Sequence, residues 1–242
     1  MKKHIPNTIT CCNLICGCIA TYNAICGNPQ MALLFIILGA VFDFFDGMSA
    51  RLLHVSSEIG KELDSLADDV TFGVAPASII FYELQVVDYP GFLEPLRCVI
   101  PYLAFIVAAF SAVRLAKFNL DTRQTTSFIG LPTPANALFW GSLIVGFGQY
   151  LEQTSWFMPA IIIGVVLSSW LLIAEIPMFA LKFKQWGFAG NEIKYCFVIF
   201  SAVALIATIA GGIITESLNL CWSGFSIIIL AYIIVSILTQ KK

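Results

Sequence analysis

The sequence predicts an all-α fold, a polytopic bundle of helices that is integral to a membrane. Of its 242 residues, 59% are hydrophobic and only 12% are charged, whereas soluble domains contain about 25% charged residues. The mean hydropathy is +0.87, and apolar stretches recur along the whole chain at close to the ~20 residues that one crossing needs. These values exclude a water-soluble globular enzyme.

About eight transmembrane helices are expected. The apolar stretches are separated by short polar or Pro/Gly segments and cover residues 8–27, 30–50, 64–87, 97–116, 134–151, 156–180, 193–213 and 218–239. No linker is long enough to divide the chain. Residues 1–242 are therefore predicted to form a single membrane domain.

The placement of basic residues predicts the topology, because cytoplasmic loops collect Lys and Arg. With eight spans and a cytoplasmic N-terminus, Arg97 is the one basic residue of the 13 that lies on the opposite side. We therefore expect both termini to face the cytoplasm, in a multi-pass protein of a bacterial or archaeal-type cytoplasmic membrane. The net charge of −2 offers no basic surplus, so nucleic acid is not an expected partner.

A group of acidic residues lies beside or inside the second and third spans. A charge costs roughly 2.5–3.5 kcal/mol at the centre of a span, so these acids require compensation. Asp43, Asp46 and Ala50 are spaced i, i+3 and i+7, and Gly60, Asp64 and Asp68 are spaced i, i+4 and i+8. Each set therefore lines one face of a helix.

We expect these two helices to pack antiparallel, because only a short loop joins them, and their acidic faces to converge near the cytoplasmic end. Clustered carboxylates repel one another, whereas hard divalent cations bind such oxygens. The pattern predicts a site for one or two Mg²⁺ or Mn²⁺ ions.

The small residues Gly47, Ala50 and Gly60 leave space for a sizeable phosphate-bearing ligand. Arg51 either contacts phosphate oxygens or anchors the helix at the interface. The predicted metal ligands are Asp43, Asp46, Asp64 and Asp68, whereas Glu58, Lys61 and Glu62 are interpreted as ordinary loop charges and Asp69 lies off the acidic face.

These residues resemble the signature of the CDP-alcohol phosphotransferase family, D-x2-D-G-x2-A-R-x8-G-x3-D-x3-D, at every position from Asp43 to Asp68. The resemblance implies transfer of a substituted phosphate from a CDP-linked donor to an alcohol, with release of CMP. It also implies roles for the matching residues: Asp43, Asp46 and Asp64 as metal ligands, Asp68 as the general base, and Gly47, Ala50 and Gly60 as the nucleotide-facing wall.

Two further stretches are similar to the membrane phosphatidylserine synthases of that family. Residues 114–119 match R-x3-F-N and residues 128–137 match F-x-G-L-P-x-P-x-A, except that Asn136 stands where alanine is expected. Residues 6–13 match P-N-x2-T-x2-N. The resemblance implies CDP-diacylglycerol and L-serine as substrates, phosphatidylserine and CMP as products, and direct attack by serine.

Serine is a zwitterion, so its site should offer a cation to the carboxylate and acceptors to the ammonium. The candidates for binding the carboxylate are Arg114, Lys117, Asn119 and Arg123; alternatively, the basic ones are positive-inside charges that bind anionic lipid headgroups. Thr10 and Asn13, at i and i+3, are predicted to bind the cytosine or ribose, or else to form a hydrogen bond between packed helices.

Two other functions stay open at this stage. The same metal site serves another alcohol acceptor, glycerol 3-phosphate or inositol phosphate, if the acceptor pocket differs. A cation-coupled transporter also places acids in a membrane, although no second copy of the acidic motif is present in the C-terminal half. The expected partners are CDP-diacylglycerol, L-serine and membrane lipids, with a second copy of the chain as a candidate.

Overall fold

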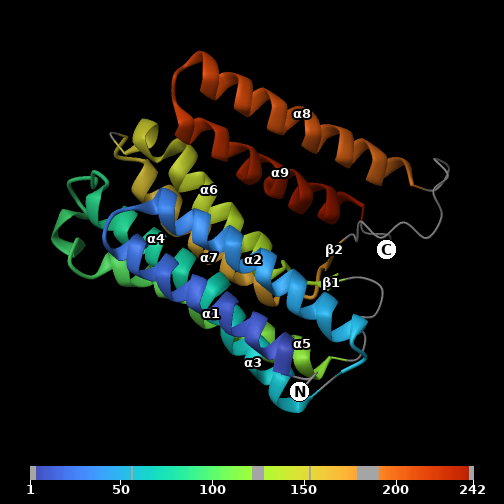
Figure 1. Cartoon of the computed structure of the whole chain (residues 1–242). Helices are drawn as coiled ribbons and strands as arrows, with labels where there is room; N and C mark the ends of the chain where they lie inside the picture. Colours follow the sequence, from blue (N-terminus) through green and yellow to red (C-terminus); the bar gives the residue numbers. More distant parts are fainter. Residues whose placement is uncertain (1–3, 56, 122–127, 153, 179–190, 240–242) are drawn as a thin grey trace.

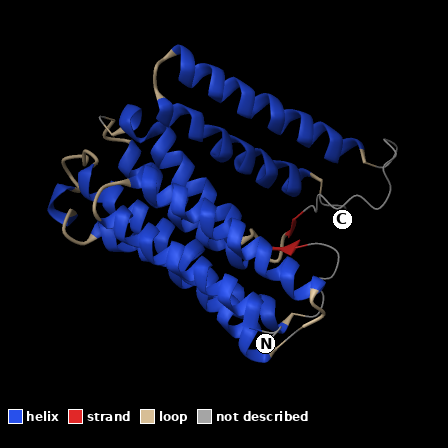
Figure 2. Cartoon of the chain, viewed as in Figure 1, coloured by secondary structure: helices blue, strands red, loops and turns tan. Residues whose placement is uncertain are grey.

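The structure, a computed structural model, describes residues 4–55, 57–121, 128–152, 154–178 and 191–239. Almost all of them lie in helices that run roughly side by side (Figures 1 and 2). The elements are α1 (His4–Ile25), α2 (Pro29–Leu52), α3 (Glu58–Asp68), the π-helical η1 (Asp69–Val74), α4 (Ala75–Val86), the 3-10 helices η2 (Glu94–Leu96) and η3 (Ile100–Phe105), α5 (Ile106–Leu120), β1 (Phe128–Ile129), α6 (Thr133–Leu151), α7 (Phe157–Ile173), β2 (Pro177–Met178), α8 (Glu192–Ile214) and α9 (Leu218–Leu238). The all-α prediction is confirmed, apart from the pair of two-residue strands.

Each of the eight apolar stretches contains a helix. Within the described residues, five helical segments are long and apolar enough to cross a membrane: residues 4–25, 29–52, 100–120, 192–214 and 218–238. The third stretch continues from α3 through η1 into α4, and α7 is shorter than a typical span. An integral membrane protein is therefore supported, while the number of eight spans stays a prediction.

The sixth stretch, predicted as one span over 156–180, does not remain helical to its end. Helix α7 ends at Ile173, and Pro177 and Met178 form β2, which pairs antiparallel with β1. Proline has no N–H to donate to a helix and disfavours helical backbone at the residue before it. The prediction was wrong here because hydropathy alone does not distinguish a helix from a buried strand.

The packing of η1 brings three helices together near the acidic residues. Thr71 of η1 is fully buried, and its Oγ1 donates a hydrogen bond to the carbonyl of Asn13 in α1 at 3.1 Å. A Cβ at Gly17 in α1 or at Gly39 in α2 would collide with Thr71. These glycines let η1 pack closely against α1 and α2. This packing fixes the position of η1, which directly follows Asp68 in the chain.

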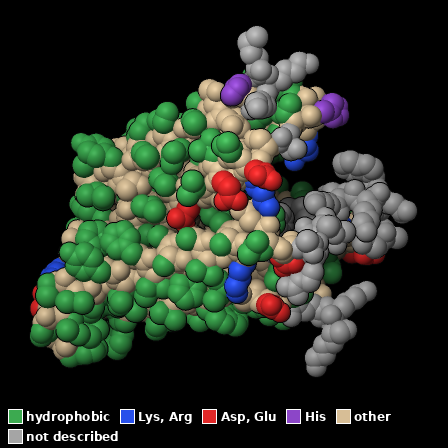
Figure 3. Space-filling model, turned by 90° about the horizontal axis from the view of Figure 1, so that it is seen from below, with side chains coloured by type: hydrophobic (Ala, Val, Ile, Leu, Met, Phe, Trp, Pro, Cys, Tyr) green, Lys and Arg blue, Asp and Glu red, His purple; other side chains and the backbone are tan. Residues whose placement is uncertain are grey.

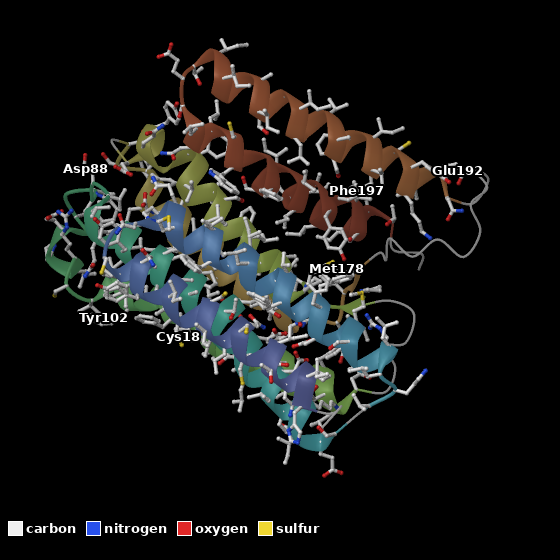
Figure 4. All side chains as sticks on the ribbon, in the orientation of Figure 1. Cys18, Asp88, Tyr102, Met178, Glu192 and Phe197 are labelled. Atoms are coloured by element: carbon white, nitrogen blue, oxygen red, sulfur yellow. The ribbon has the colours of Figure 1, made fainter. Side chains whose placement is uncertain are left out.

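Helices α8 and α9 form an outer layer, in which α9 packs on α6 and α8 packs on α9 (Figure 1). Phe197 of α8 lies against Tyr232 of α9, with ring centroids 6.1 Å apart (Figure 4). Hydrophobic side chains cover much of the visible face of the bundle, and most of the charged side chains gather in its middle and right-hand part (Figure 3). Such a surface suits a surrounding bilayer.

Candidate active site

Three of the four predicted metal ligands meet at one point. One carboxylate oxygen from each of Asp43, Asp64 and Asp68 lies within 4.8 Å of the other two. Asp68 is buried, and the buried Oδ1 of Asp64 has no hydrogen-bond partner among the residues that the structure describes. Three carboxylates this close repel one another, whereas a divalent cation takes clustered carboxylate oxygens as ligands. The residues present therefore fit a hard divalent ion.

Asp46, the fourth predicted ligand, is held by the first helix. Its side chain is buried, and its Oδ2 accepts a hydrogen bond of 2.6 Å from the hydroxyl of Thr10. Its oxygens are not among those that meet within 4.8 Å. A direct bond from Asp46 to metal stays a prediction.

Asn13, one turn after Thr10 on α1, holds Asp68 in a similar way. Its Nδ2 donates a 3.0 Å hydrogen bond to Asp68 Oδ1. Thr10 and Asn13 were predicted to contact the nucleotide or to join packed helices. The structure places both on the carboxylates of the acidic motif, where they orient these side chains, and contact with a nucleotide stays a prediction.

The two acid-bearing helices do not pack directly on each other as expected. Helix α1 packs against both α2 and α3, whereas the backbones of α2 and α3 make little contact. The expectation was wrong because it left out α1, whose buried Thr10 and Asn13 reach one carboxylate on each side. The carboxylates of Asp43 and Asp64 nevertheless converge, because their side chains extend into the same space.

A cavity of about 260 Å³ opens beside the acidic cluster. This volume is near the lower end of the roughly 300–1,000 Å³ of typical ligand sites. All three small residues that the sequence predicted as the ligand-facing wall line it. Its lining consists of Pro6, Asn7, Thr10, Asp46, Gly47, Ala50, Val55, Ser57, Gly60, Lys61 and Asp64. Donors, carboxylates and glycines therefore face one space.

The two glycines in this wall occupy positions that differ in the space available for a side chain. A Cβ on Gly60 would lie 2.9 Å from Ser57 Oγ, the N-cap of α3, and 3.0 Å from Asn7 Oδ1. A Cβ on Gly47 would approach only Arg51 Nη1, at 3.9 Å. Packing therefore requires glycine at position 60, whereas at position 47 glycine leaves space for a ligand. Arg51 is exposed beside Gly47, where it can reach a bound phosphate.

Arg114 is a buried cation close to the acidic cluster. Its side chain is 7% exposed and lies over the Phe118 ring, with Cζ 5.5 Å from the centroid. It interacts electrostatically with Asp68, and Nη1 makes a long hydrogen bond of 3.5 Å to Thr133 Oγ1. The buried Nε has no hydrogen-bond partner in the described part of the chain. An unpaired N–H of this kind favours an anionic group on a ligand.

The other predicted acceptor-binding residues are more dispersed. Lys117 is exposed at the end of α5. Asn119 Nδ2 donates a 2.7 Å hydrogen bond to Ser65 Oγ, and the Asn119 carbonyl accepts one of 2.8 Å from Lys61 Nζ. Asn119 thus joins α5 to α3, and its contact with an acceptor stays a prediction. Arg123 lies outside the described residues.

Lys61 is a site residue that the sequence interpretation missed. It was assigned to an ordinary solvated loop, yet it lines the cavity. Its position next to Gly60 and one turn before Asp64 could have indicated this place, because residues three apart on a helix lie on the same face. The cavity therefore contains a cation that can face phosphate oxygens.

The segment Phe128–Leu131 packs against the C-terminal end of α7 and the residues that follow it. Gly130 has φ of +76°, and a Cβ there would lie 2.6 Å from the carbonyl oxygen of Leu172. The Gly130 N–H donates to Ile176 O at 2.9 Å, and the Leu131 N–H donates to Leu171 O at 2.9 Å. Only glycine fits this backbone and this contact, which explains the glycine in the F-x-G-L-P pattern.

Comparison with known sequences identifies the family. A sequence model described as CDP-alcohol phosphatidyltransferase matches residues 3–180. The chain belongs to the CDP-alcohol phosphatidyltransferase family. The match includes every residue of the acidic motif and the whole cavity lining, so the resemblance found in the sequence is confirmed. This CDP-alcohol phosphatidyltransferase assignment gives no support to a transporter.

Several relatives of the chain are named CDP-diacylglycerol–serine O-phosphatidyltransferase. The protein from Bacillus subtilis is 43% identical over 133 residues, which cover 54% of this chain and 70% of the relative. The one from Mycobacterium leprae is 30% identical over 239 residues, or 95% and 72% of the two chains. The one from Methanocaldococcus jannaschii is 33% identical over 207 residues, or 86% and 84%.

Proposed function

We propose that this protein is a membrane enzyme that transfers the phosphatidyl group of CDP-diacylglycerol to L-serine, giving phosphatidylserine and CMP. The observation that carries the proposal is the convergence of Asp43, Asp64 and Asp68 within 4.8 Å, in a chain of the CDP-alcohol phosphatidyltransferase family. The name shared by relatives from three genera supports serine as the acceptor.

Asp68 is proposed as the general base. Asn13 donates to Asp68 Oδ1, which orients the carboxylate and leaves Oδ2 to take the proton of the serine hydroxyl. The serine oxygen then attacks the phosphorus next to the diacylglycerol, a new P–O bond forms, and the bond to the CMP oxygen breaks. We favour this direct attack because the other aspartates are engaged as metal ligands.

One or two Mg²⁺ or Mn²⁺ ions, held by Asp43, Asp46, Asp64 and Asp68, would supply Lewis acidity and neutralise the oxygens of the diphosphate. Thr10 contributes by fixing Asp46, and Lys61 and Arg51 contribute positive charge beside the cavity. Gly47, Ala50 and Gly60 line the cavity and would form the wall that faces the nucleotide. This division assigns binding to the wall of the cavity and proton transfer to Asp68.

The site is proposed to face the cytoplasm. Serine can then arrive from water and CMP can leave into it, since both are water-soluble. Helix α1 begins and helix α9 ends toward the same end of the bundle (Figure 1), which is compatible with an even number of spans. Arg51 lies in the last turn of α2, Lys61 lies near the start of α3, and Lys117 lies in the last turn of α5, and basic residues at such positions agree with the positive-inside rule. The donor's acyl chains would remain in the bilayer. Association into a homodimer stays a prediction.

An assay of CMP release tests the proposal. Purified protein in lipid, with CDP-diacylglycerol and Mg²⁺ or Mn²⁺, should release CMP when L-serine is added and form phosphatidylserine in equal amount. Glycerol 3-phosphate and inositol phosphate should give no product. If one of these alcohols gave product and serine did not, the reaction type would stand but the acceptor would be that alcohol. Absence of CMP release with every alcohol would overturn the proposal.

A further inference from the structure

A second, smaller cavity shares no lining residue with the first. It has a volume of about 40 Å³ and opens between the end of α5, the end of α7 and strand β1. Four charged residues line it: Arg114, Lys117, Asp121 and Glu175. The cavity could hold about three water molecules, at roughly 10–15 Å³ of such volume for each. It therefore suits the head of a small polar molecule.

The charges in this cavity are of both signs. Arg114 and Lys117 lie one turn apart on α5 and present cations, whereas Asp121 and Glu175 present carboxylates. Two helices also end here, α5 at Leu120 and α7 at Ile173. The C-terminal end of a helix carries a partial negative charge. One part of the cavity thus favours an anion and another part favours a cation.

Arg114 gives the cavity a buried group that requires a ligand. The residue is only 7% exposed, and its buried Nε has no hydrogen-bond partner in the part of the chain that the structure describes. Arg114 also interacts electrostatically with Asp68. The same side chain therefore lines the small cavity and interacts electrostatically with the proposed catalytic base.

We propose that this cavity binds the head of a zwitterionic α-amino acid. The carboxylate lies on Arg114 and Lys117, the ammonium faces Asp121 and Glu175, and the hydroxymethyl arm extends toward Asp68. The inference rests on the proposed function and deepens it, since it assigns the residues that recognise the ammonium. Neither acid belongs to the family signature or to the predicted acceptor site.

The same charges explain the choice among acceptors. A phosphate-bearing alcohol carries up to two negative charges and no positive one, so it would meet the carboxylates of Asp121 and Glu175 and two helix C-termini without compensation. A zwitterion satisfies both halves of the cavity. The cavity therefore selects against acceptors such as glycerol 3-phosphate by repulsion as well as by attraction.

The test compares L-serine with L-glycerate, which has a hydroxyl in place of the ammonium. The double variant Asp121→Asn/Glu175→Gln should raise the KM for serine about tenfold, the factor expected for one charged contact, and leave the KM for CDP-diacylglycerol unchanged. The inhibition constant of L-glycerate against serine should stay the same or decrease. The matched control is Glu62→Gln, an exposed acid on α3 that lines neither cavity; it should change none of these values.

The outcomes separate the inference from the proposed function. A wild-type protein that does not use serine would overturn the proposed function. A double variant that keeps the wild-type serine KM and the wild-type discrimination between serine and glycerate would overturn the inference while the proposed function stands. A double variant that no longer binds CDP-diacylglycerol is replaced by the single variants, each of which should show a smaller rise in the serine KM and the same relaxed discrimination.

Discussion

At the scale of single residues, the acidic cluster divides into groups with different tasks. Asp68 is held by Asn13 and is proposed to move a proton, whereas Asp43 is proposed only to bind metal. Asp68→Asn should therefore lower kcat by about 10²–10⁴-fold and retain metal-dependent binding of CDP-diacylglycerol. Asp43→Asn should lose both turnover and binding. Turnover is measured as CMP release and binding as retention of labelled CDP-lipid by the purified protein.

The control for this comparison is Asp88→Asn, the same change of an aspartate outside the acidic motif. Asp88 and Met178 lie toward opposite ends of the bundle (Figure 4). It should leave both binding and turnover intact. Equal loss of lipid binding in the Asp43 and Asp68 variants would contradict the division of labour, since it would make Asp68 primarily a binding residue.

Gly47 provides a second test at this scale, because a methyl group there enters the cavity and meets no protein atom closer than 3.9 Å. Gly47→Ala should keep the thermal midpoint of the wild type and weaken binding of CDP-diacylglycerol by about tenfold or more, since an overfilled site forces its contents to shift. Gly91→Ala, where a Cβ would also meet no atom within 4 Å, should alter neither quantity. A Gly47→Ala protein with wild-type affinity would show that the ligand does not approach this position.

At the scale of the elements, α1 acts as the support for the site. Thr10→Val removes the hydroxyl that holds Asp46 at 2.6 Å and keeps the shape of the side chain. Loss of such a supporting hydrogen bond typically costs 10–100-fold in metal affinity. The concentration of Mn²⁺ that gives half-maximal activity should rise by about this factor, with a smaller change in the KM for serine.

Thr8→Val is the matched control on the same helix, because the exposed Thr8 hydroxyl donates a hydrogen bond to the His4 carbonyl and, within the described residues, to no carboxylate. It should leave the requirement for Mn²⁺ unchanged. If Thr10→Val and Thr8→Val needed the same ion concentration, α1 would serve packing alone.

The role of α1 also shows what the sequence could and could not predict. The faces carrying Asp43 and Asp46, and Asp64 and Asp68, follow from helical periodicity, which is a local property. The bonds from Thr10 to Asp46 and from Asn13 to Asp68 join residues 36 and 55 positions apart. Local spacing contains no information about such pairs, so a third helix between the acidic ones was not predicted.

Strand β2 illustrates the same limit. The apolar run through Met178 is equally suitable for a buried helix or a buried strand, and its partner β1 lies almost 50 residues earlier in the chain. The resemblance to the family signature supplied the roles of the matching residues, but Asp121 and Glu175 lie outside any pattern. Their place became visible only when the ends of α5 and α7 came together.

At the scale of the whole molecule, apolar helices surround the carboxylates, which makes folding and metal binding interdependent. Asp43, Asp64 and Asp68 share a space of less than 5 Å, and without a counter-ion their mutual repulsion opposes the packing of α1, α2 and α3. An ion that binds only the folded protein adds about 2.7 kcal/mol of stability at 100 times its Kd. For a chain of this size, such a gain raises the thermal midpoint by roughly 5–10 °C.

Removal of divalent ions with a chelator should therefore abolish CMP release and also lower the thermal midpoint of the protein in lipid by about 5 °C. Added Mg²⁺ or Mn²⁺ should restore both. The Asp64→Asn variant should show almost no change in midpoint between chelator and metal, because it lacks one of the converging oxygens, whereas Asp88→Asn should respond like the wild type. If the thermal midpoint of the wild type were the same with and without divalent ions, the acidic cluster would fold without a bound ion. The metal would then have to bind together with the nucleotide.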